Sequence, residues 1–184
     1  MKNEDYVVLV DAQNTVLGVS PKLEAHNANT PLHRGFSVFL FSSKGELLLQ
    51  QRSHTKKTFP LIWSNSVCGH PMLNESNTDA AKRRLSYELG ISNVEIFEAI
   101  SDYRYKVCTD NICENEICPV LVCFTNKKPA INKNEVEDLR WINWKDFLKE
   151  TKDKDKKYSL WSKEEAKLLA KNEKFFKLYK KLVK

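Results

Sequence analysis

Runs of apolar residues alternate with polar stretches along the chain and predict a succession of strands and helices. The predicted strands are rich in β-branched and aromatic residues and cover residues 6–10, 16–19, 35–41, 46–51, 94–100, 103–107, 112–124 and 139–142. The turn sequence Ser42-Ser-Lys-Gly45 predicts a hairpin between two of these strands. Helices are predicted at about 77–89, at 144–150 and from about 162. This order predicts an α/β fold of the α+β type, with a mixed, mostly antiparallel sheet flanked by helices.

Helix-start signals precede two of the predicted helices. Ser76-Asn-Thr-Asp79 fits a capping box, and Gly90 predicts the end of the same helix. Ser162-Lys-Glu-Glu165 is a second capping box and predicts that the last helix begins there. Four apolar residues lie along one side of that helix: Leu168, Phe175, Tyr179 and Leu182. We interpret it as a helix packed on the sheet, with a membrane-surface anchor as the alternative.

The composition favours a globular protein. The 184 residues include 41% hydrophobic and 29% charged residues. No linker, repeat or low-complexity block divides them, so a single domain over residues 1–184 is predicted. No apolar run reaches the ~18 residues of a membrane span and no signal peptide is recognised, so a cytoplasmic location is expected. The five cysteines show no Cys-x-x-Cys spacing and are interpreted as reduced thiols.

The net charge of +6 is compatible with three kinds of partner: nucleic acid, an anionic membrane surface or a phosphorylated small molecule. Much of the excess comes from lysines at 152–157 and 177–184, so the predicted C-terminal helix is lysine-rich. A run of like charges is usually a solvated surface. The net charge by itself therefore does not discriminate between these partners.

Three histidines and two glutamates are the best candidates for holding a divalent metal. His26, His33 and His70 lie near loop signals, whereas Glu114 and Glu116 project from one face of a predicted strand because they are two residues apart. Imidazole and carboxylate groups together bind zinc, manganese or magnesium. The alternative is that all five are ordinary surface residues, because the histidines are far apart in sequence and form no His-x-x-x-His motif.

Four basic residues are candidates for binding an anionic group. Lys22, Arg52, Lys56 and Arg84 together would neutralise a diphosphate, for which arginine offers paired donors. Glu88 follows Arg84 by four residues on the same helix face. This pair is either a surface ion pair of small value, or a phosphate contact from Arg84 combined with a magnesium contact from Glu88.

Three further residues have both a structural and a functional interpretation. Cys68 precedes Gly69-His70 in a predicted loop, where it is either a reactive thiol or a buried structural one. Trp161 is either a core residue or an aromatic face that stabilises a cation. Tyr105 is either a core residue or a hydroxyl able to pass a proton.

The motif that begins at Gly69 resembles the Nudix box, which has the form G-x5-E-x7-R-E-U-x-E-E-x-G-U, where U is a bulky aliphatic residue. Seven residues follow this spacing: Gly69, Glu75, Arg83, Leu85, Glu88, Gly90 and Ile91. Arg84 and Tyr87 stand where the hydrolases of this superfamily carry two metal-binding glutamates. Because those carboxylates hold the metals that activate water, their loss argues against hydrolase activity.

The same departures, together with Ser-Asn-Ser-Val-Cys-Gly-His-Pro at 64–71 and Glu114-Asn-Glu116, resemble the type 1 isopentenyl-diphosphate isomerases. The resemblance runs from about residue 4 to Trp161 and implies a Nudix-like fold. It implies the interconversion of isopentenyl diphosphate and dimethylallyl diphosphate in isoprenoid biosynthesis. A Nudix hydrolase is the second prediction, and a noncatalytic module that binds nucleic acid is the third.

The resemblance also implies a role for each candidate residue. The metal ligands, for manganese, zinc or magnesium, are His26, His33, His70, Glu114 and Glu116. The acid–base pair is Cys68 and Glu116, with Tyr105 and Trp161 beside the reacting carbons. The residues facing the diphosphate are Lys22, Arg52, Lys56 and Arg84, with Glu88 on its magnesium ion. No flavin, nucleic acid or membrane is implied, and a monomer or weak homodimer is expected.

Overall fold

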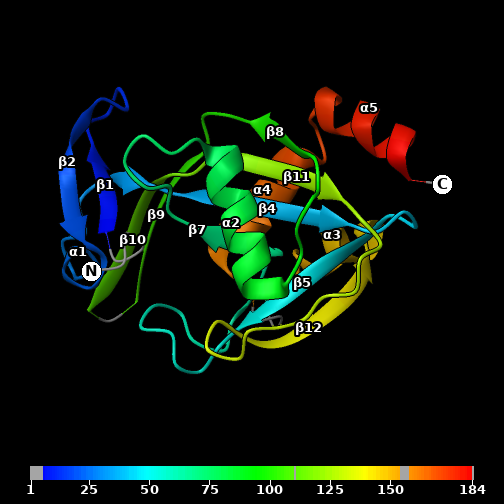
Figure 1. The fold of residues 1–184 in the computed structure, drawn as a ribbon, viewed down its shortest axis with the longest axis horizontal. Coiled ribbons are helices and arrows are strands. Elements are labelled where there is room, and N and C mark those ends of the chain that lie inside the picture. Colours follow the sequence, from blue (N-terminus) through cyan, green and yellow to red (C-terminus); the bar gives the residue numbers. More distant parts are fainter. Residues whose placement is uncertain (1–5, 110, 154–157, 184) are drawn as a thin grey trace.

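The structure is a computed structural model that describes residues 6–109, 111–153 and 158–183. Within these residues two β-sheets lie side by side, and helices pack on both faces of the larger sheet (Figure 1). Two strand pairs, β3 with β10 and β4 with β11, are parallel, and the other paired strands run antiparallel. The predicted mixed, mostly antiparallel fold class is confirmed.

The described strands fall into these two sheets. The smaller has the order β2 (Val16–Pro21), β1 (Tyr6–Val10), β3 (His33–Arg34), β10 (Ile112–Ile117) and β9 (Arg104–Thr109). The larger has the order β12 (Val136–Asn143), β5 (Glu46–Arg52), β4 (Phe36–Phe41), β11 (Val120–Phe124) and β8 (Ile96–Ile100). Two short strands extend it, β6 (Trp63–Ser64) beside β5 and β7 (Val67–Gly69) beside β4.

The described helices are α1 (Lys22–Ala25), α2 (Asn77–Leu89), α3 (Trp144–Glu150), α4 (Leu160–Leu169) and α5 (Glu173–Leu182). Helix α2 has the predicted bounds because both of its ends are capped. The Ser76 hydroxyl accepts from the Asp79 amide at 3.1 Å, and Gly90 adopts a left-handed φ of +64° that suits glycine. The cap at Ser76 fixes where the helix begins, directly after the loop that follows β7 and carries His70.

The larger sheet is buried on both faces, which explains the unbroken apolar run of β4. Val38 and Leu40 pack with Leu85 of helix α2 on one face. Phe39 and Phe41, whose side chains alternate with these, pack on the other face with residues of α3, α4 and α5. Packing on both faces fixes the position of β4 and of the strands that pair with it, β5, β7 and β11.

The single strand predicted at 112–124 is wrong, because the chain passes there from one sheet into the other. Strand β10 ends at Ile117, and β11 begins at Val120. Pro119 lacks the amide hydrogen that a continuous ladder needs, and its carbonyl accepts from the Ser37 amide at 3.0 Å. On one side of Pro119, β10 pairs in parallel with β3 of the smaller sheet. On the other side, β11 pairs in parallel with β4 of the larger sheet, so the two sheets meet at this point.

The predicted last helix is also corrected. Helix α4 begins at Leu160, because Ser159 rather than Ser162 is its N-cap, and the helix ends at Leu169. Asn172 then caps α5 by accepting from the Phe175 amide at 2.9 Å. Because of this break, the four apolar residues predicted for one helix side do not form one stripe, and Leu168 is exposed.

Helix α5 packs against the larger sheet, as the favoured interpretation holds. Phe175 is fully buried, its ring lies 5.4 Å from that of Phe41, and the Tyr179 hydroxyl donates to the Gly45 carbonyl at 2.8 Å.

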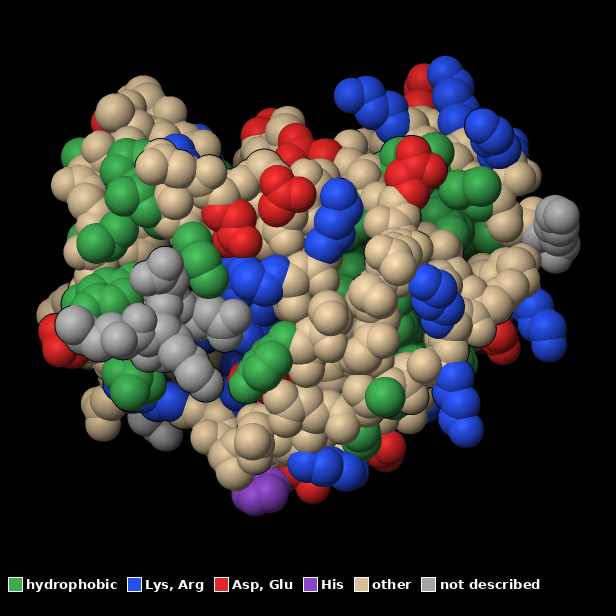
Figure 2. Space-filling model, viewed as in Figure 1, with side chains coloured by type: hydrophobic (Ala, Val, Ile, Leu, Met, Phe, Trp, Pro, Cys, Tyr) green, Lys and Arg blue, Asp and Glu red, His purple; other side chains and the backbone are tan. Residues whose placement is uncertain are grey.

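Lysines gather over helix α5, while other basic side chains are spread across the same face of the molecule (Figure 2). Among the described residues, no helix has the length and apolarity needed to cross a membrane. The lysines at 154–157 lie outside the described residues.

Two cysteines depart from the prediction of reduced thiols. Cys108 and Cys113 lie opposite each other in the β9–β10 hairpin and form a disulfide. The hairpin register brings them together, which spacing along the chain did not indicate. The remaining described cysteines, Cys68, Cys118 and Cys123, are free.

Candidate active site

A cavity of about 610 Å³ opens at the junction of the two sheets. Eleven of the predicted site residues line it: Lys22, His26, Arg52, Lys56, Cys68, His70, Arg84, Tyr105, Glu114, Glu116 and Trp161. The other two, His33 and Glu88, lie directly behind this lining, in contact with Glu116 and Arg84 respectively. Residues drawn from most of the chain length thus surround one cavity.

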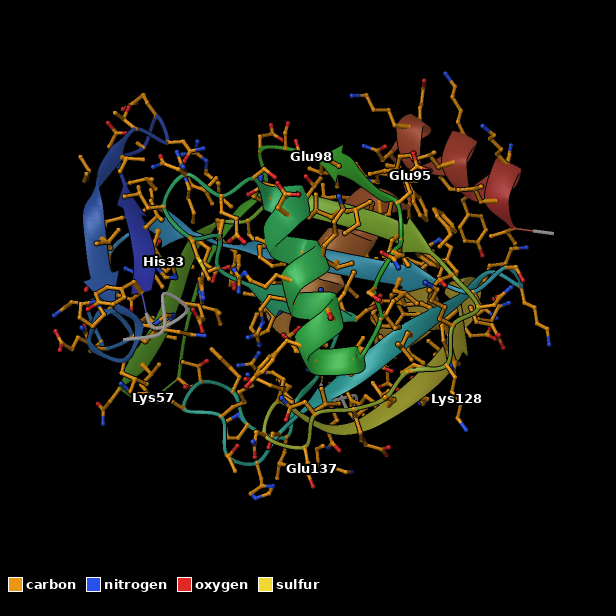
Figure 3. The ribbon with its side chains drawn as sticks, viewed as in Figure 1. His33, Lys57, Glu95, Glu98, Lys128 and Glu137 are labelled. Atoms are coloured by element: carbon orange, nitrogen blue, oxygen red, sulfur yellow. A yellow bond between two sulfur atoms is a disulfide. The ribbon has the colours of Figure 1, made fainter. Side chains whose placement is uncertain are left out.

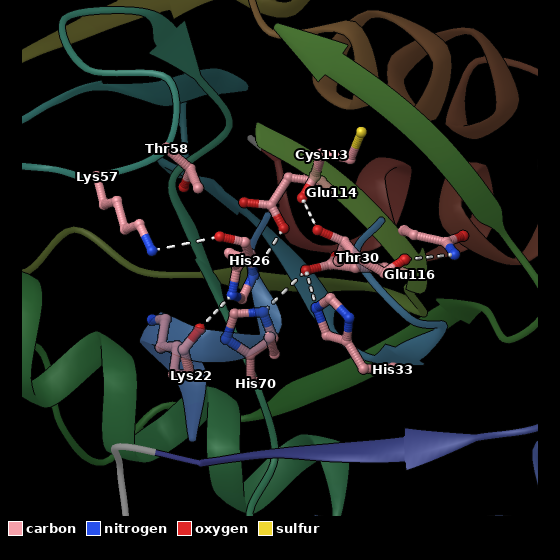
Figure 4. A network of polar contacts seen from close by, with 12 residues as sticks. Lys22, His26, Thr30, His33, Lys57, Thr58, His70, Cys113, Glu114 and Glu116 are labelled. Atoms are coloured by element: carbon pink, nitrogen blue, oxygen red, sulfur yellow. Dashed lines mark hydrogen bonds and ion pairs between the residues drawn. The ribbon is translucent and has the colours of Figure 1, made fainter. Parts of the chain in front are cut away.

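The three predicted histidines converge at one end of the cavity. The ligand atoms of His26, His33, His70 and Glu114 all lie within 4.8 Å of one another. Glu116 completes the group, because its Oε1 atom is 2.9 Å from Nε2 of His70 and 3.5 Å from Nε2 of His33 (Figure 4). His33, labelled in Figure 3, is fully buried and reaches this group from β3, which lies between β1 and β10. The surface alternative for these five residues is therefore wrong, since all five are largely buried.

Backbone carbonyls fix the orientation of two of these imidazoles. The Lys22 carbonyl lies 2.6 Å from Nδ1 of His26, and the Pro31 carbonyl lies 2.9 Å from Nδ1 of His33. A carbonyl only accepts, so each Nδ1 carries a hydrogen and each Nε2 is directed at the glutamates. Carbonyl contacts of this kind are the usual support of metal-binding histidines.

The electrostatics of the cluster favour a positive charge at its centre. Burial lowers the pKa of His70 to about 3, so this imidazole is neutral at pH 7. Burial also opposes charge on His33 and Glu116, but their contact raises the pKa of His33 and holds that of Glu116 well below its ordinary range. Neutral imidazoles and ionised carboxylates are the donor set that divalent transition metals prefer. The cluster therefore fits a divalent metal ion.

Cys68 lies on the short strand β7 rather than in the predicted loop. Its thiol donates to Oδ1 of Asn65 at 3.1 Å and is 3.6 Å from the Ser37 hydroxyl. Burial raises the pKa of Cys68 to about 12, so the sulfur carries its hydrogen. Asn65 was not among the predicted site residues, although it lies within the motif at 64–71. Its amide nitrogen donates to the carbonyls of Val38 and Val67, which leaves Oδ1 to accept from the thiol.

Glu116 uses its two oxygens for different contacts. One faces the histidines, and the other accepts from the Tyr105 hydroxyl at 3.0 Å. Burial, and then the charge of Glu116, raise the pKa of Tyr105 well above its ordinary value, so this hydroxyl remains a donor. The rings of Tyr105 and Trp161 lie 5.6 Å apart, and Nε1 of Trp161 donates to Asn65 at 3.2 Å. An aromatic wall thus connects the carboxylate with the thiol.

Another part of the cavity lining, beginning at Lys22 beside the histidines, is basic. Burial, with repulsion from Lys56 and Arg84, lowers the pKa of Lys22 to about 8. Arg84 donates to Glu88 at 2.7 Å, and this pair is buried rather than a surface ion pair. Gln50 donates to Glu88 at 2.9 Å, which fixes the carboxylate behind the cavity. The clustering of Lys22, Lys56 and Arg84 produces a site suited to an anion of more than one charge.

The Nudix-box positions are used in two ways. Glu75 and Arg83 form an ion pair at 2.7 Å, and Arg83 also donates to the His70 carbonyl at 3.2 Å, so they support the loop before α2. Of the two substituted positions, Arg84 faces the cavity, whereas Tyr87 is exposed on the surface. Neither provides a carboxylate where the hydrolase pattern requires one.

Comparison with known proteins agrees with this geometry. Residues 31–161 match the NUDIX domain, and the chain belongs to that family. Two solved structures share the fold: DR0079 from Deinococcus radiodurans, with a TM-score of 0.69 at 18% identity over 91% of this chain and 99% of that one, and a MutT protein from Methanosarcina mazei, with a TM-score of 0.59 at 16% identity over 82% and 94%.

Sequence relatives place the chain more narrowly. It is 45% identical to the isopentenyl-diphosphate Delta-isomerase of Shigella boydii over 145 residues. These residues cover 78% of this chain and 80% of that protein. It is 40% identical over 147 residues to the enzyme of the same name from Saccharopolyspora erythraea, covering 79% and 76%. Within the Nudix superfamily, the chain belongs to the type 1 isopentenyl-diphosphate Delta-isomerases.

Proposed function

We propose that this protein interconverts isopentenyl diphosphate and dimethylallyl diphosphate by adding one proton and removing another. The observation that carries the proposal is the presence, in one cavity, of a free thiol, a tyrosine-bound carboxylate and several cations. The thiol and carboxylate serve the five-carbon chain, and the cations serve the diphosphate. The identity of 40–45% to isomerases of this name supports the same assignment.

The reaction requires two proton-transfer groups, because the alkene is not activated. One group protonates the terminal carbon, which produces a tertiary carbocation, and the other removes a proton from the carbon beside the diphosphate arm. We assign these roles to Cys68 and Glu116, which line the cavity from the separate strands β7 and β10. Tyr105 orients the Glu116 carboxyl through its hydroxyl.

The carbocation must be shielded from water and stabilised. Trp161 and Tyr105 present aromatic rings to the cavity. An aromatic face contributes ~2 kcal/mol to a desolvated cation. Trp161 is buried and anchored by its hydrogen bond to Asn65, so its ring is held in place during the reaction.

The diphosphate is a remote handle whose binding orients the reacting carbons. We assign its binding to Lys22, Arg52, Lys56 and Arg84, with Glu88 placed to hold a magnesium ion on it. The orientation of Arg52 is fixed by the basic loop, since its guanidinium donates to the Thr58 and Phe59 carbonyls.

The histidine and glutamate cluster would hold a divalent metal, which we propose to be manganese, zinc or magnesium. When bound, this ion supplies positive charge that holds the Glu116 carboxyl in place and tunes its acidity. The backbone carbonyls keep the Nε2 atoms of His26 and His33 directed at the glutamates. Glu116 accepts with its other oxygen from the Tyr105 hydroxyl.

The direct test incubates the purified protein with isopentenyl diphosphate and magnesium. We expect acid-labile allylic diphosphate to form. Release of phosphate or pyrophosphate without this product would instead support the Nudix hydrolase. Cys68→Ala should lower kcat by about 100-fold to 10,000-fold, the usual contribution of a proton-transfer group. Cys123→Ala is the matched control, because Cys123 is a free, buried cysteine in the core beside α2. Equal activity of the two variants would remove Cys68 from the mechanism.

A further inference from the structure

The basic part of the cavity lining also contains a carboxylate, which no sequence motif indicates. Glu135 lies just before β12 and lines the cavity. Its Oε2 atom contacts the Lys56 ammonium and accepts from Arg84 at 2.8 Å. The side chain is only 16% exposed. One oxygen atom thus occupies the space between two of the cations that we assign to the diphosphate.

Glu135 is ionised in this position. Burial opposes its charge, but Arg84 and Lys56 outweigh burial and hold the pKa of Glu135 below its ordinary value. Its charge in turn counters the repulsion among Lys22, Lys56 and Arg84. A cluster of partly buried cations needs such compensation, because charges in a low-dielectric site interact strongly.

The two carboxylates on Arg84 differ in how firmly they are held. Glu88 is nearly fully buried and also accepts from Gln50. The Glu135 side chain, within the described part of the chain, has ion pairs to Lys56 and Arg84 and no further partner. An anion that takes over both cations can therefore displace Glu135 without breaking any other hydrogen bond of that side chain.

We propose that Glu135 is an internal counter-ion that occupies the diphosphate subsite of the substrate-free protein and is displaced by the substrate. This inference rests on the proposed function. In the substrate-free protein Glu135 keeps Lys56 and Arg84 together and directed at the subsite. It also sets a threshold, since an anion must interact with these cations more strongly than a single carboxylate does. A diphosphate meets this requirement and a monoanion does not, so Glu135 contributes to specificity.

The test measures binding of inorganic pyrophosphate by calorimetry without added magnesium. Glu135→Gln removes the competing charge and keeps the side-chain size. We expect this variant to bind pyrophosphate about fivefold more tightly than the original chain, which corresponds to about 1 kcal/mol. Inorganic phosphate should gain at least as much, because the threshold against weaker anions is lost. Glu135→Ala should show the same direction, and near-ultraviolet circular dichroism checks that both variants are folded.

The matched control is Glu137→Gln. Glu137 lies on β12 at the outer surface, where it contacts His54 (Figure 3). Its replacement should leave pyrophosphate affinity unchanged. Equal or weaker binding by folded Glu135→Gln would overturn the counter-ion role while leaving the isomerase proposal intact. Absence of pyrophosphate binding by every chain, the original included, would contradict the proposed function and this inference with it.

Discussion

Replacing Glu165 by glutamine should stabilise the folded protein at neutral pH. Glu165 lies on α4 and is fully buried behind the cavity. Its Oε1 atom is 3.8 Å from the Cys118 sulfur, and Oε2 has no hydrogen-bond partner among the described residues. Burial, reinforced by the charge of Glu116 and opposed by hydrogen bonding from Ser37, raises the pKa of Glu165 from 4.5 to about 8. The carboxyl is therefore mostly protonated in the folded state at pH 7.

The size of the effect follows from the difference between the folded and unfolded chains. Between pH 4.5 and pH 7 the unfolded chain releases a proton that folded Glu165 retains. This difference costs the folded state about 1.4 kcal/mol per pH unit, or about 3 kcal/mol at pH 7. The contribution of the neutral acid is fully present below pH 4.5 and is lost as the pH rises towards 8. Glutamine cannot ionise, so the variant avoids this loss.

The assay is urea unfolding followed by tryptophan fluorescence at a series of pH values. The variant should exceed the original chain in free energy of unfolding by about 1 kcal/mol at pH 5 and about 4 kcal/mol at pH 8. The pH series is its own control, because a packing difference between the side chains would not depend on pH. A difference that stays constant from pH 5 to pH 8 would refute the reasoning.

Two further predictions concern the hairpin disulfide and the magnesium contact. Reducing the Cys108–Cys113 bond should lower the free energy of unfolding by about 2 kcal/mol, because a short loop is no longer closed in the unfolded chain; a Cys108→Ser variant should not respond to the reductant, and a response equal to that of the original chain would exclude this bond as the cause. Glu88→Gln should raise the magnesium concentration needed for half-maximal isomerase activity, since we propose that its carboxylate holds the ion on the diphosphate. An unchanged magnesium titration would reject that role for Glu88.

Local signals in the sequence were sufficient for several elements. The Ser76 cap and Gly90 define both ends of α2 because capping depends on residues within one helical turn. The two-residue spacing of Glu114 and Glu116 placed both carboxylates on one face of β10, where the structure has them lining the cavity. The motif at 64–71 was sufficient to predict Cys68 and His70 as site residues, and both line the cavity.

Other features depend on contacts between distant parts of the chain. His33 meets Glu116 because β3 pairs with β10, in a register that pairs these two residues, and Cys68 meets Ser37 because β7 pairs with β4. The nearest sequence signal for the passage between the sheets is Pro119, which lies between two strand-like segments at 112–117 and 120–124.

The sequence by itself determined the helix caps, the alternation of buried and exposed positions and the inventory of reactive groups, because each depends on a few neighbouring residues. Only the tertiary structure decided which groups share a cavity and what charge they carry. Glu135 and Glu165 are the same residue type, yet one is ionised between two cations and the other is protonated in the core. Burial and neighbouring charge set that difference, and both are produced by strand pairing and helix packing across the whole chain.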